Sequence, residues 1–497
     1  MQRSMFGRAM AVTTLAAAAL LASGTAAQGD PAGLTRIFTD PFTNSTSQHA
    51  TAVEPDTFAF GSTIVAVTQS GRFFDGGSSD IGFATSSNGG QSWTGGTLPG
   101  ITSYLSPAGT FPRVSDPAVA YDARHNVWLV SSIPLRSDRS VPNVFVSRST
   151  DGGLTFANPV TAATASSGQS FDKNWTACDN HPASPFYGHC YTTFDDANAG
   201  DRLKVTTSAD GGLTWGPVFN TGNAATGLGG QPVVRPDGMV VIPASNASES
   251  AIISFRSLTG GASWRSTVTV ASALAHREAG SLRSGPLPSA EVDGGGRVYV
   301  VWGDCRFRPN CSGNDIVMSS STDGVTWTSP VRLPIGTTTD GHDNFIPGIA
   351  VDDRTSGSGG HLAVTLYSYD VSACGSSCAL KVRYIQSSNG GATWSAPATL
   401  AGPFGTTLIA NTNQGRMVGD YISTSWVDTP GGRRAFGAFA VGQTPTNGKA
   451  FDEATFVPTG GLNLTGTFTA TAAADRVSPT NEALLHANDN SEVFRRR

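Results

Sequence analysis

The sequence predicts an all-β fold in which four-stranded antiparallel sheets form the blades of a β-propeller. Three observations lead to this prediction: a short box that recurs six times, apolar strands that begin at regular intervals, and a composition rich in turn formers. The 497 residues include 59 glycines, and only 14% are Asp, Glu, Lys or Arg. Such a composition is typical of short strands joined by tight turns.

The recurring box follows an alternating strand in each of its copies. Five of its six copies have an Asp-Gly or Asn-Gly core, which is typical of a tight hairpin turn because such turns need positive φ at their central residues. Recurrence at this spacing indicates a repeat architecture. The copies are SSNGGQSW (86–93), STDGGLTF (149–156), SADGGLTW (208–215), SLTGGASW (257–264), STDGVTW (321–327) and SSNGGATW (387–394).

A second series of signals marks the first strand of each blade. The intervals leave room for four strands in each repeat, which is the composition of a propeller blade. The series favours seven blades over six, with a box in blades 1–6. The seventh blade is expected to take its last strand from GLTRIFTD (33–40). Apolar strands are predicted to begin after EP (54–55), DP (116–117), DK (172–173), QP (231–232), LP (287–288), IP (346–347) and GD (419–420).

The first 27 residues have the pattern of an export signal. Arg3 and Arg8 precede the short apolar run AVTTLAAAALLA, and small residues follow it near Ala27. This run is too short to span a bilayer. We therefore expect a secreted protein cleaved near Ala27, with a single propeller domain over residues 28–460 and a loosely ordered tail over 461–497.

Six cysteines fall into three neighbouring pairs, which predicts three local disulfides in an exported chain. Zinc ligation is the alternative, but no pair combines zinc spacing with matching histidines. The formal net charge of −5, with no long basic run, disfavours a nucleic acid or an anionic membrane as partner. The expected bridges are Cys178–Cys190, Cys305–Cys311 and Cys374–Cys378.

The boxes resemble the Asp-box, or BNR repeat, of the sialidase superfamily, and the resemblance runs over nearly the whole mature chain. It implies that each box lies on the hairpin between the third and fourth strands of a blade and has a structural role. Asp151, Asp210 and Asp323 are then turn residues. Asp-boxes also occur in other hydrolases, polysaccharide lyases, sorting receptors and assembly factors, so they identify a fold better than a reaction.

Propeller topology sorts the charged residues onto two faces. The starts of the first strands share one face with the loops between second and third strands, and these surround the mouth of the central channel. Acids held close together there raise one another's pKa, as a general acid requires, and arginines bind anionic sugars through paired contacts. This face is expected to present Glu54, Asp116, Asp172, Lys173, Asp343, Asp420, Tyr421, and Asp304, Arg306 and Arg308 of the stretch VWGDCRFRPNCSGND (301–315).

The resemblance implies a site with an arginine clamp, an Asp acid/base, and a Tyr nucleophile assisted by Glu. Tyr421 is then the candidate nucleophile with Glu54 as its partner, and Asp116 and Asp172 complete the candidate catalytic set. The family's Arg-Ile-Pro signature is absent, because FPRVSDP (111–117) holds its ingredients in another order. The candidate substrate-binding residues are Arg306, Arg308, Arg113, Arg283, Arg416, Asp343 and Asp420.

The sequence thus predicts a secreted, sialidase-like glycoside hydrolase that acts on extracellular glycans as a monomer. A polysaccharide lyase, with Tyr421 or a histidine as base, and a non-catalytic carbohydrate- or protein-binding propeller are the alternatives. No cofactor is expected, although acid-rich loops such as FDDANAGD (194–201) could hold structural calcium. His342 beside Asp343 could form a proton-transfer pair or a metal site, with an exposed loop histidine as the alternative.

Overall fold

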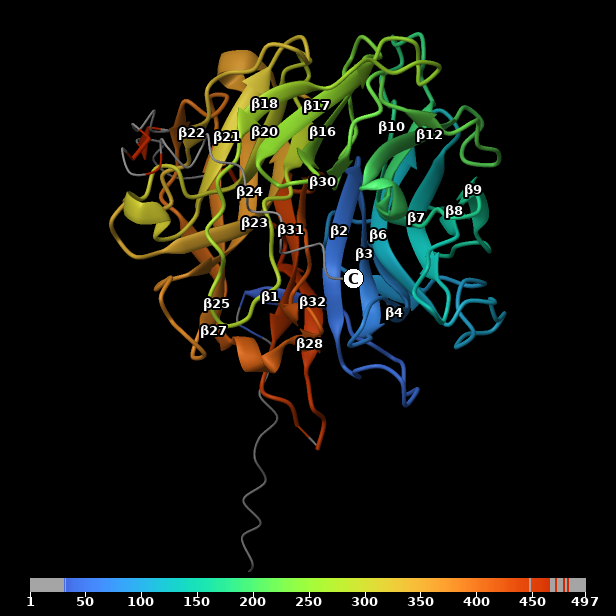
Figure 1. Ribbon diagram of the computed structural model, residues 1–497, viewed down its shortest axis with the longest axis horizontal. Helices are drawn as coiled ribbons and strands as arrows, with labels where there is room; N and C mark the ends of the chain where they lie inside the picture. The colour runs from blue at the N-terminus through green and yellow to red at the C-terminus, as the bar shows by residue number, and fades with distance from the viewer. Residues whose placement is uncertain are drawn as a thin grey trace, which may run out of the picture.

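The computed structural model describes residues 31, 33–446, 448–464, 470–471, 477–478 and 481, and over them the ordered elements are β-strands and four short 3-10 turns (Figure 1). The all-β prediction is confirmed. The expected export signal lies outside the described residues, as does most of the predicted tail. Within the described part of the chain, no helix has the length and apolar character that crossing a membrane requires.

The first half of the chain forms three antiparallel units of four strands each. The first two units share one sheet, but only the pair Ser78–Val114 joins them. Their strands are β2 (Ala52–Phe60), β3 (Thr63–Arg72), β4 (Ser78–Ser86) and β5 (Thr94–Thr97), then β6 (Arg113–Asp122), β7 (Val127–Leu135), β8 (Asn143–Ser149) and β9 (Val160–Thr164). The third unit holds β10 (Phe171–Cys178), β11 (Cys190–Asp196), β12 (Arg202–Ser208) and β13 (Phe219–Asn220), with the 3-10 turn η1 (Ala197–Ala199) after β11.

The second half repeats this pattern. In the fourth unit the first strand is split into β14 (Gly227–Leu228) and β15 (Val233–Val234), which both pair with β16 (Val240–Asn246), followed by β17 (Ala251–Ser257) and β18 (Val268–Ser272). The fifth unit holds β19 (Ser289–Val292), β20 (Val298–Asp304), β21 (Asp315–Ser321) and β22 (Val331–Arg332), with η2 (Pro309–Cys311) after β20. The sixth holds β23 (Asp343–Val351), β24 (Leu362–Tyr369), β25 (Ala379–Ser387) and β27 (Ala398–Gly405), with η3 (Gly357–Gly359), β26 (Thr393–Trp394) and η4 (Thr406–Leu408) in its loops.

The last sheet joins the two ends of the described chain. β30 (Ser423–Thr429), β31 (Gly432–Gly442) and β32 (Glu453–Pro458) are completed by β1 (Leu34–Phe38), which pairs antiparallel with β32, as the sequence predicts (Figure 1). A hairpin of β28 (Ala410–Thr412) and β29 (Gly415–Met417) precedes this sheet. β33 (Ala470–Thr471) pairs with β26, so part of the predicted tail lies against the sixth unit.

Each of the six boxes lies between the last two strands of its unit. Asp151 accepts a hydrogen bond from Ser149 Oγ (2.7 Å) and from the backbone N–H groups of Leu154 (3.1 Å) and Thr155 (3.0 Å). Asp210 and Asp323 make the equivalent contacts in their own turns. These carboxylates therefore hold turns.

Bulges interrupt the first strand at the same place in four units. In each of these units, the pairing of the first strand with the second is interrupted by two residues that have no partner in the register. The first of these two residues is Glu54 in β2, Asp116 in β6, Lys173 in β10 and Ile346 in β23. These four residues have positive φ, between 48° and 58°, which is uncommon for residues other than glycine. A bulge re-aims a side chain, and here it does so at equivalent points of several units. The dipeptides 54–55, 116–117, 172–173 and 346–347 thus lie inside strands, whereas the sequence prediction places them before the strands.

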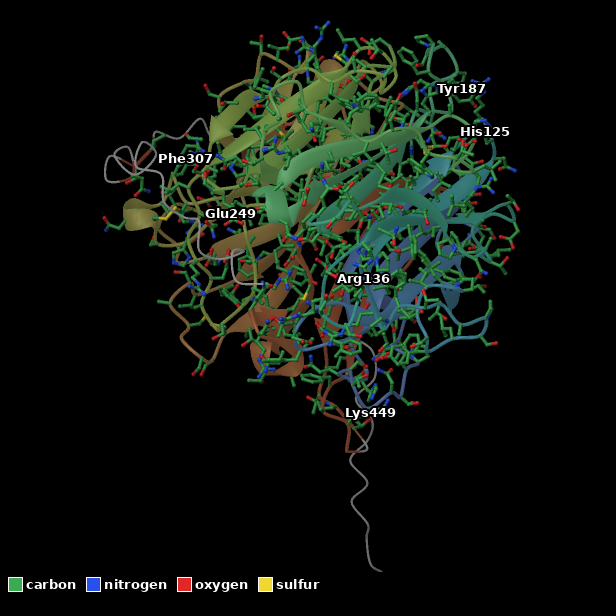
Figure 2. The ribbon with its side chains drawn as sticks, turned by 45° about the vertical axis from the view of Figure 1, so that its right-hand side comes forward. His125, Arg136, Tyr187, Glu249, Phe307 and Lys449 are labelled. Carbon is green, nitrogen blue, oxygen red and sulfur yellow. A yellow bond between two sulfur atoms is a disulfide. The ribbon has the colours of Figure 1, made fainter. Side chains whose placement is uncertain are left out.

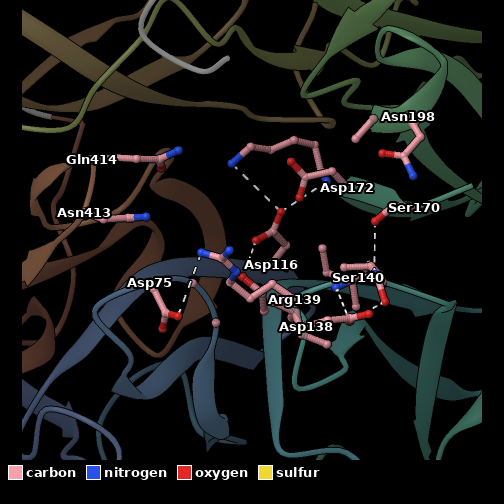
Figure 3. A pocket seen from close by; sticks show the side chains of 18 of the residues that line it. Asp75, Asp116, Asp138, Arg139, Ser140, Ser170, Asp172, Asn198, Asn413 and Gln414 are labelled. Carbon is pink, nitrogen blue, oxygen red and sulfur yellow. Dashed lines mark hydrogen bonds and ion pairs between the residues drawn. The ribbon is translucent and has the colours of Figure 1, made fainter. Parts of the chain in front are cut away.

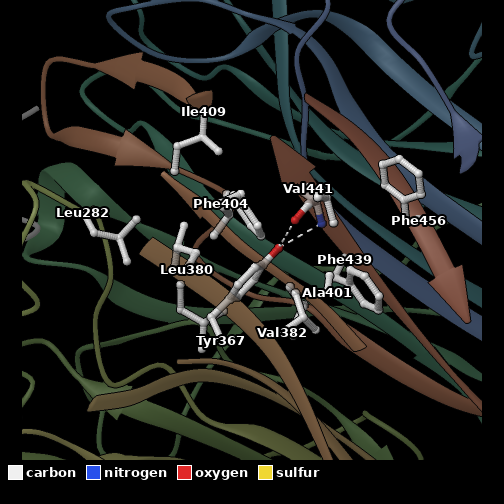
Figure 4. Close-up of a cluster of buried hydrophobic side chains, with 14 of the residues drawn as sticks. Leu282, Tyr367, Leu380, Val382, Ala401, Phe404, Ile409, Phe439, Val441 and Phe456 are labelled. Carbon is white, nitrogen blue, oxygen red and sulfur yellow. Dashed lines mark hydrogen bonds between the residues drawn. The ribbon is translucent and has the colours of Figure 1, made fainter. Parts of the chain in front are cut away.

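Neighbouring units are held together by apolar packing and by a repeated polar contact. Figure 4 shows the packing between the sixth and last units, where the Tyr367 hydroxyl donates to Ala440 O (2.8 Å) and accepts from Ala440 N (2.9 Å). Between neighbouring first strands, Asp56 Oδ2 accepts from Val119 N (2.7 Å) and Ser289 Oγ from Ile349 N (3.1 Å). In both contacts, a side-chain oxygen on the first strand of one unit accepts a hydrogen bond from a backbone N–H group on the first strand of the next unit.

The three predicted disulfides are present: Cys178–Cys190, Cys305–Cys311 and Cys374–Cys378. Zinc ligation by these cysteines is thereby excluded, because every cysteine sulfur is bonded to another.

Candidate active site

A cavity of about 330 Å³ opens at the end of the molecule where the bulged residues lie (Figure 3). Its inner wall comes from the first strands, with Asp116 on β6 and Asp172 and Lys173 on β10. Part of its rim comes from loops between second and third strands, and the rest comes from the β18–β19 connection and the β28–β29 hairpin. The remaining charged or amide residues around it are Arg72, Asp75, Asp138, Arg139, Asn198, Arg283, Asn413 and Gln414. Residues far apart in sequence thus share one charged cavity.

Beneath this cavity, Asp420 binds two basic side chains. Its carboxylate binds Lys173 Nζ, and Arg283 Nε donates to its other oxygen at 2.6 Å. The two cations hold the pKa of Asp420 far below its usual range, although burial opposes them. The same attraction raises the pKa values of Lys173 and Arg283, against the opposing effect of burial. Asp420 is therefore a fixed anion that positions two cations.

Glu54 and Asp116 are buried carboxyl groups beside the same ammonium group. Lys173 Nζ lies 3.9 Å from Glu54 Oε1 and 4.0 Å from Asp116 Oδ2. Burial, followed by repulsion from Asp420 and Asp116, raises the pKa of Glu54 to about 8. Burial also raises the pKa of Asp116, which Lys173 opposes and Asp172 reinforces. Asp116 borders the cavity, whereas Glu54 lies behind it and accepts from Gln69 Nε2 and from Asp420 N (3.3 Å).

Tyr421 lies close to these acids, but the cavity does not include it. Its hydroxyl donates to Pro117 O at 3.0 Å, and its ring packs edge-on against Trp175 with 4.8 Å between centroids. Burial and the surrounding carboxylates raise its pKa well above the usual value. A nucleophilic phenol must lose its proton readily, and this environment opposes that loss.

The arginines of the stretch 301–315 do not reach the cavity. Arg306 Nε donates to Asp304 Oδ1 (2.9 Å), while Arg308 binds Asp315 (2.8 Å) and Asp340 (3.0 Å). The Arg308 side chain is only 1% exposed. Both arginines thus hold the loop within the fifth unit. Figure 2 labels Phe307 of this loop at the edge of the molecule.

The tail contributes to the same loop. Asn481 Nδ2 donates to the backbone oxygens of Arg308 (2.7 Å) and Cys305 (3.1 Å), and Ser478 N donates to Arg306 O (2.9 Å). The disulfide loop is therefore a packed structural element in this part of the chain.

The other candidates are divided between the cavity rim and separate contacts. Arg113 binds Asp75 (2.6 Å) beside the rim and covers the ring of Phe73. Arg416 donates to Ile409 O (3.2 Å). Of the five candidate arginines, Arg283 is the one that both lines the cavity and joins the central cluster.

The pairing of Asp343 differs from the predicted one. Asp343 Oδ2 lies 3.0 Å from Nδ1 of His276, whereas His342 Nδ1 lies 3.0 Å from Asp340 Oδ2. His276 comes from the long connection between β18 and β19, which also supplies Arg283. Sequence adjacency suggested His342 as the partner, but His342 lies in the loop just before β23 and is paired there with Asp340.

The sequence analysis missed two buried acids on this side of the molecule. The pKa values of Glu249 and Glu278 are both raised to about 8, mainly by burial. Glu278 accepts from Asn314 Nδ2 at 2.9 Å and from the Ser284 hydroxyl. The length of the connection between residues 272 and 289 was the available signal for Glu278, because long loops without secondary structure are often functional. Glu249 lies in an ordinary short turn, which has no such signal.

No family model matches the chain, and no curated protein matches it either. Among solved structures, a leech intramolecular trans-sialidase is similar at 12% identity and a TM-score of 0.44, over 67% of this chain and 67% of that one. An α-L-arabinofuranosidase from Fusarium graminearum is similar at 13% identity and a TM-score of 0.42, over 70% of this chain and 96% of that one. A protein of unknown function from Dyadobacter fermentans is similar at 17% identity and a TM-score of 0.43, over 68% of this chain and 95% of that one. The structural neighbours thus include glycoside hydrolases.

Proposed function

We propose that this protein is an exported glycoside hydrolase whose active site is the 330 Å³ cavity. The four-stranded units would form seven blades around one axis, with the cavity at one end of it. The observation that carries the proposal is the pair of acids at the cavity wall, Asp116 with its raised pKa and Asp172 beside it. Three disulfides are consistent with export.

Asp116 has the properties that a general acid needs. Ser115 Oγ donates to one of its oxygens at 2.6 Å and Lys173 N to the other at 3.2 Å, so the carboxyl is held in one orientation. Its raised pKa keeps a larger share of it protonated near neutral pH. It would donate this proton to the leaving glycosidic oxygen.

Asp172 would act as the second carboxyl group. Hydrolysis of a glycosidic bond commonly needs two carboxyls on opposite sides of the bond, one protonated and one ionised. Asp172 is partly exposed at the cavity, and it contributes to raising the pKa of Asp116. It would serve as the base or nucleophile, in place of Tyr421.

The remaining lining residues favour an anionic or hydroxyl-rich sugar. Lys173 and Arg283 are neutralised in part by Asp420, while Arg139 on the rim is 46% exposed in its side chain and lies 3.9 Å from Asp75. Asn198, Asn413 and Gln414 offer amides for hydroxyl groups. A cavity of this size lies at the lower end of the roughly 300–1,000 Å³ that ligand sites occupy.

The test is hydrolysis of a panel of fluorogenic sialosides, uronides and neutral glycosides by the purified protein and its Asp116→Asn variant. Release by the wild type, and loss of release in the variant, would support the proposal. Asp237→Asn, at an exposed turn, is the matched control and should retain full activity. If no glycoside is cleaved, the hydrolase proposal is wrong. An unsaturated product absorbing in the ultraviolet would instead identify a lyase.

A further inference from the structure

A second cavity, of about 180 Å³, lies at the opposite end of the first strands. On β2, Glu54 lies at the end with the candidate active site, and Asp56, Phe58 and Phe60 line the second cavity. The first strands of all the units contribute to its wall, which places it on their common axis. The lining residues used below are Asp56, Phe58, Phe60, Trp175, His181, Glu291, Asp353, Trp426 and Arg433.

The two cavities are separated by aromatic side chains. Trp175 borders the second cavity, and its ring also packs against the ring of Tyr421. These two residues and Lys173 surround an internal space of only about 10 Å³. A ligand in the second cavity would therefore bind independently of one in the first.

Two carboxyl groups lie inside the second cavity. Asp56 is 2% exposed, and its Oδ2 accepts from Val119 N. Glu291, on β19, is influenced first by burial and then by the charge of Asp56, and these raise its pKa to about 8. The pKa of Asp56 is raised to about 7, mainly by burial. Both acids thus line one poorly solvated space, where the charge of Asp56 disfavours ionisation of Glu291.

The basic residues of the cavity wall already have acidic partners. Arg433 binds Asp352 (2.5 Å) and Asp353 (2.6 Å), and Asp428 lies 3.8 Å from it. His181 Nδ1 lies 3.4 Å from Asp179. Among the described residues that line this cavity, these two are the basic ones, so the field inside it favours a positive charge once Asp56 and Glu291 ionise.

Four aromatic side chains lie among the small, aliphatic and hydroxyl-bearing residues of the rest of the wall. Phe58, Phe60 and Trp175 line the cavity, and Phe60 is 45% exposed at its edge. Trp426 is only 5% exposed, and its indole Nε1 has no hydrogen-bond partner among the described residues. Aromatic rings together with carboxylates are the surroundings in which proteins bind organic ammonium ions. The unpaired indole N–H additionally calls for an acceptor oxygen.

We propose that the second cavity binds a small organic ammonium ion that also carries a hydroxyl group. The cation would bind between Asp56 and Glu291 against the aromatic rings, and its oxygen would accept from Trp426. A metal ion is a poorer candidate, because no three potential ligands among His, Cys, Asp and Glu converge within the described residues.

Choline is a suitable probe, with 3,3-dimethylbutanol as its uncharged isostere and calcium chloride as the metal arm. Calorimetry on the full chain should detect choline binding, with the alcohol at least about tenfold weaker because it lacks the charge. Affinity should rise about tenfold from pH 6 to pH 8.5 as the carboxyls ionise, and binding should release protons to the buffer. Equal binding of choline and the alcohol, binding of calcium in place of choline, or no binding would overturn the proposal.

Two variants locate the site. Glu291→Gln should weaken choline binding about tenfold or more and leave glycoside hydrolysis unchanged. Trp426→Phe should weaken it severalfold while keeping the ring. Asp116→Asn, in the other cavity, is the control and should bind choline as the wild type does, and circular dichroism reports whether each variant is folded. Unchanged affinity in a folded Glu291→Gln variant would contradict the assignment.

Discussion

Aspartates of the boxes and acids of the central cluster share one chemistry but have opposite environments. Asp151 and Asp323 are exposed; burial raises their pKa values, but several hydrogen bonds within their own turns together outweigh it and lower these pKa values to about 2. Glu54 is buried among other charges, and its pKa is raised to about 8. The two environments differ in how far along the chain the residues that surround each carboxyl group lie. A box carboxylate is surrounded by residues within four positions of it, whereas the cluster combines segments hundreds of residues apart.

This contrast distinguishes carboxyl groups that stabilise the fold from carboxyl groups that are suited to catalysis. A carboxylate whose pKa is lowered by local hydrogen bonds is a poor proton donor and a good turn residue. A buried carboxyl with a raised pKa destabilises the fold when ionised but is suited to proton transfer. The recurring motif therefore identifies the aspartates that hold turns, and the reactive candidates lie outside it.

The largest expected effect is on activity. Asp116→Asn should reduce glycoside hydrolysis by about 10²- to 10⁴-fold, because it removes the proposed proton donor. Asp210→Asn, in a box, should retain wild-type activity once both variants are compared at equal folded fraction. Rates on the best substrate of the glycan panel measure this. Comparable losses in the two variants would remove the distinction between the regions.

A second prediction concerns the anchor at Asp420. Arg283→Met leaves the buried Asp420 with one cation in place of two, and we expect a loss of about 3 kcal/mol in the free energy of unfolding. The matched control is Arg354→Met, which breaks the exposed Arg354–Asp428 pair and should cost under about 1 kcal/mol. Urea denaturation gives both values. Equal costs would show that burial does not distinguish the two pairs.

A third prediction tests the boxes. Asp151→Ala should destabilise the protein by about 1–2 kcal/mol, because backbone N–H groups of the turn lose their acceptor. Asp151→Asn should cost less, since Asn389 accepts from Thr393 N at 2.8 Å at the equivalent place of another box. Thermal unfolding of the two variants compares them. A larger loss for the Asn variant would show that charge matters more than the accepting oxygen.

The smallest effects are in the dependence of stability on pH, where the two regions act with opposite signs. The pKa values of Asp151 and Asp323 are lower in the folded state, so their contribution is present above about pH 4 and is lost toward about pH 2. The pKa of Glu54 is raised, so its contribution is present below about pH 4.5 and declines as pH rises to about 8. In Glu54→Gln the decline between pH 4.5 and 8 should be shallower. An unchanged slope in urea titrations would contradict this.

Local patterns predicted the fold far better than the site. The boxes and the three disulfides depend on near neighbours, and the pairing of β1 with the last sheet follows from counting the strands of the last repeat. The candidate set contained Glu54, Asp116, Asp172 and Asp420, because strand starts converge in a repeat fold, and it contained Arg283 as part of the arginine clamp that the family resemblance implies. Three of the four bulges could be predicted from the sequence, because a proline inside a strand indicates an edge or a bulge and Pro55, Pro117 and Pro347 lie inside β2, β6 and β23.

The arginines of residues 301–315 show where such reasoning stops. A short disulfide loop with two arginines on the expected face resembles a binding loop, yet Arg306 and Arg308 are held by Asp304, Asp315 and Asp340. Asp340 is 32 residues beyond Arg308 in the chain. Partners at that separation depend on the packing of side chains, which periodicity does not describe. The same holds for the pairing of His276 with Asp343.

The most direct test of the contrast between the two regions is a measurement of carboxyl pKa values by carbon-13 NMR on aspartate-labelled protein. Asp116→Asn and Asp210→Asn would assign the two resonances. We predict that Asp116 titrates above the ordinary value of 3.8 and Asp210 below it. Titration of Asp116 at or below 3.8 would contradict the account, because that carboxyl could not then serve as the proton donor of the proposed site.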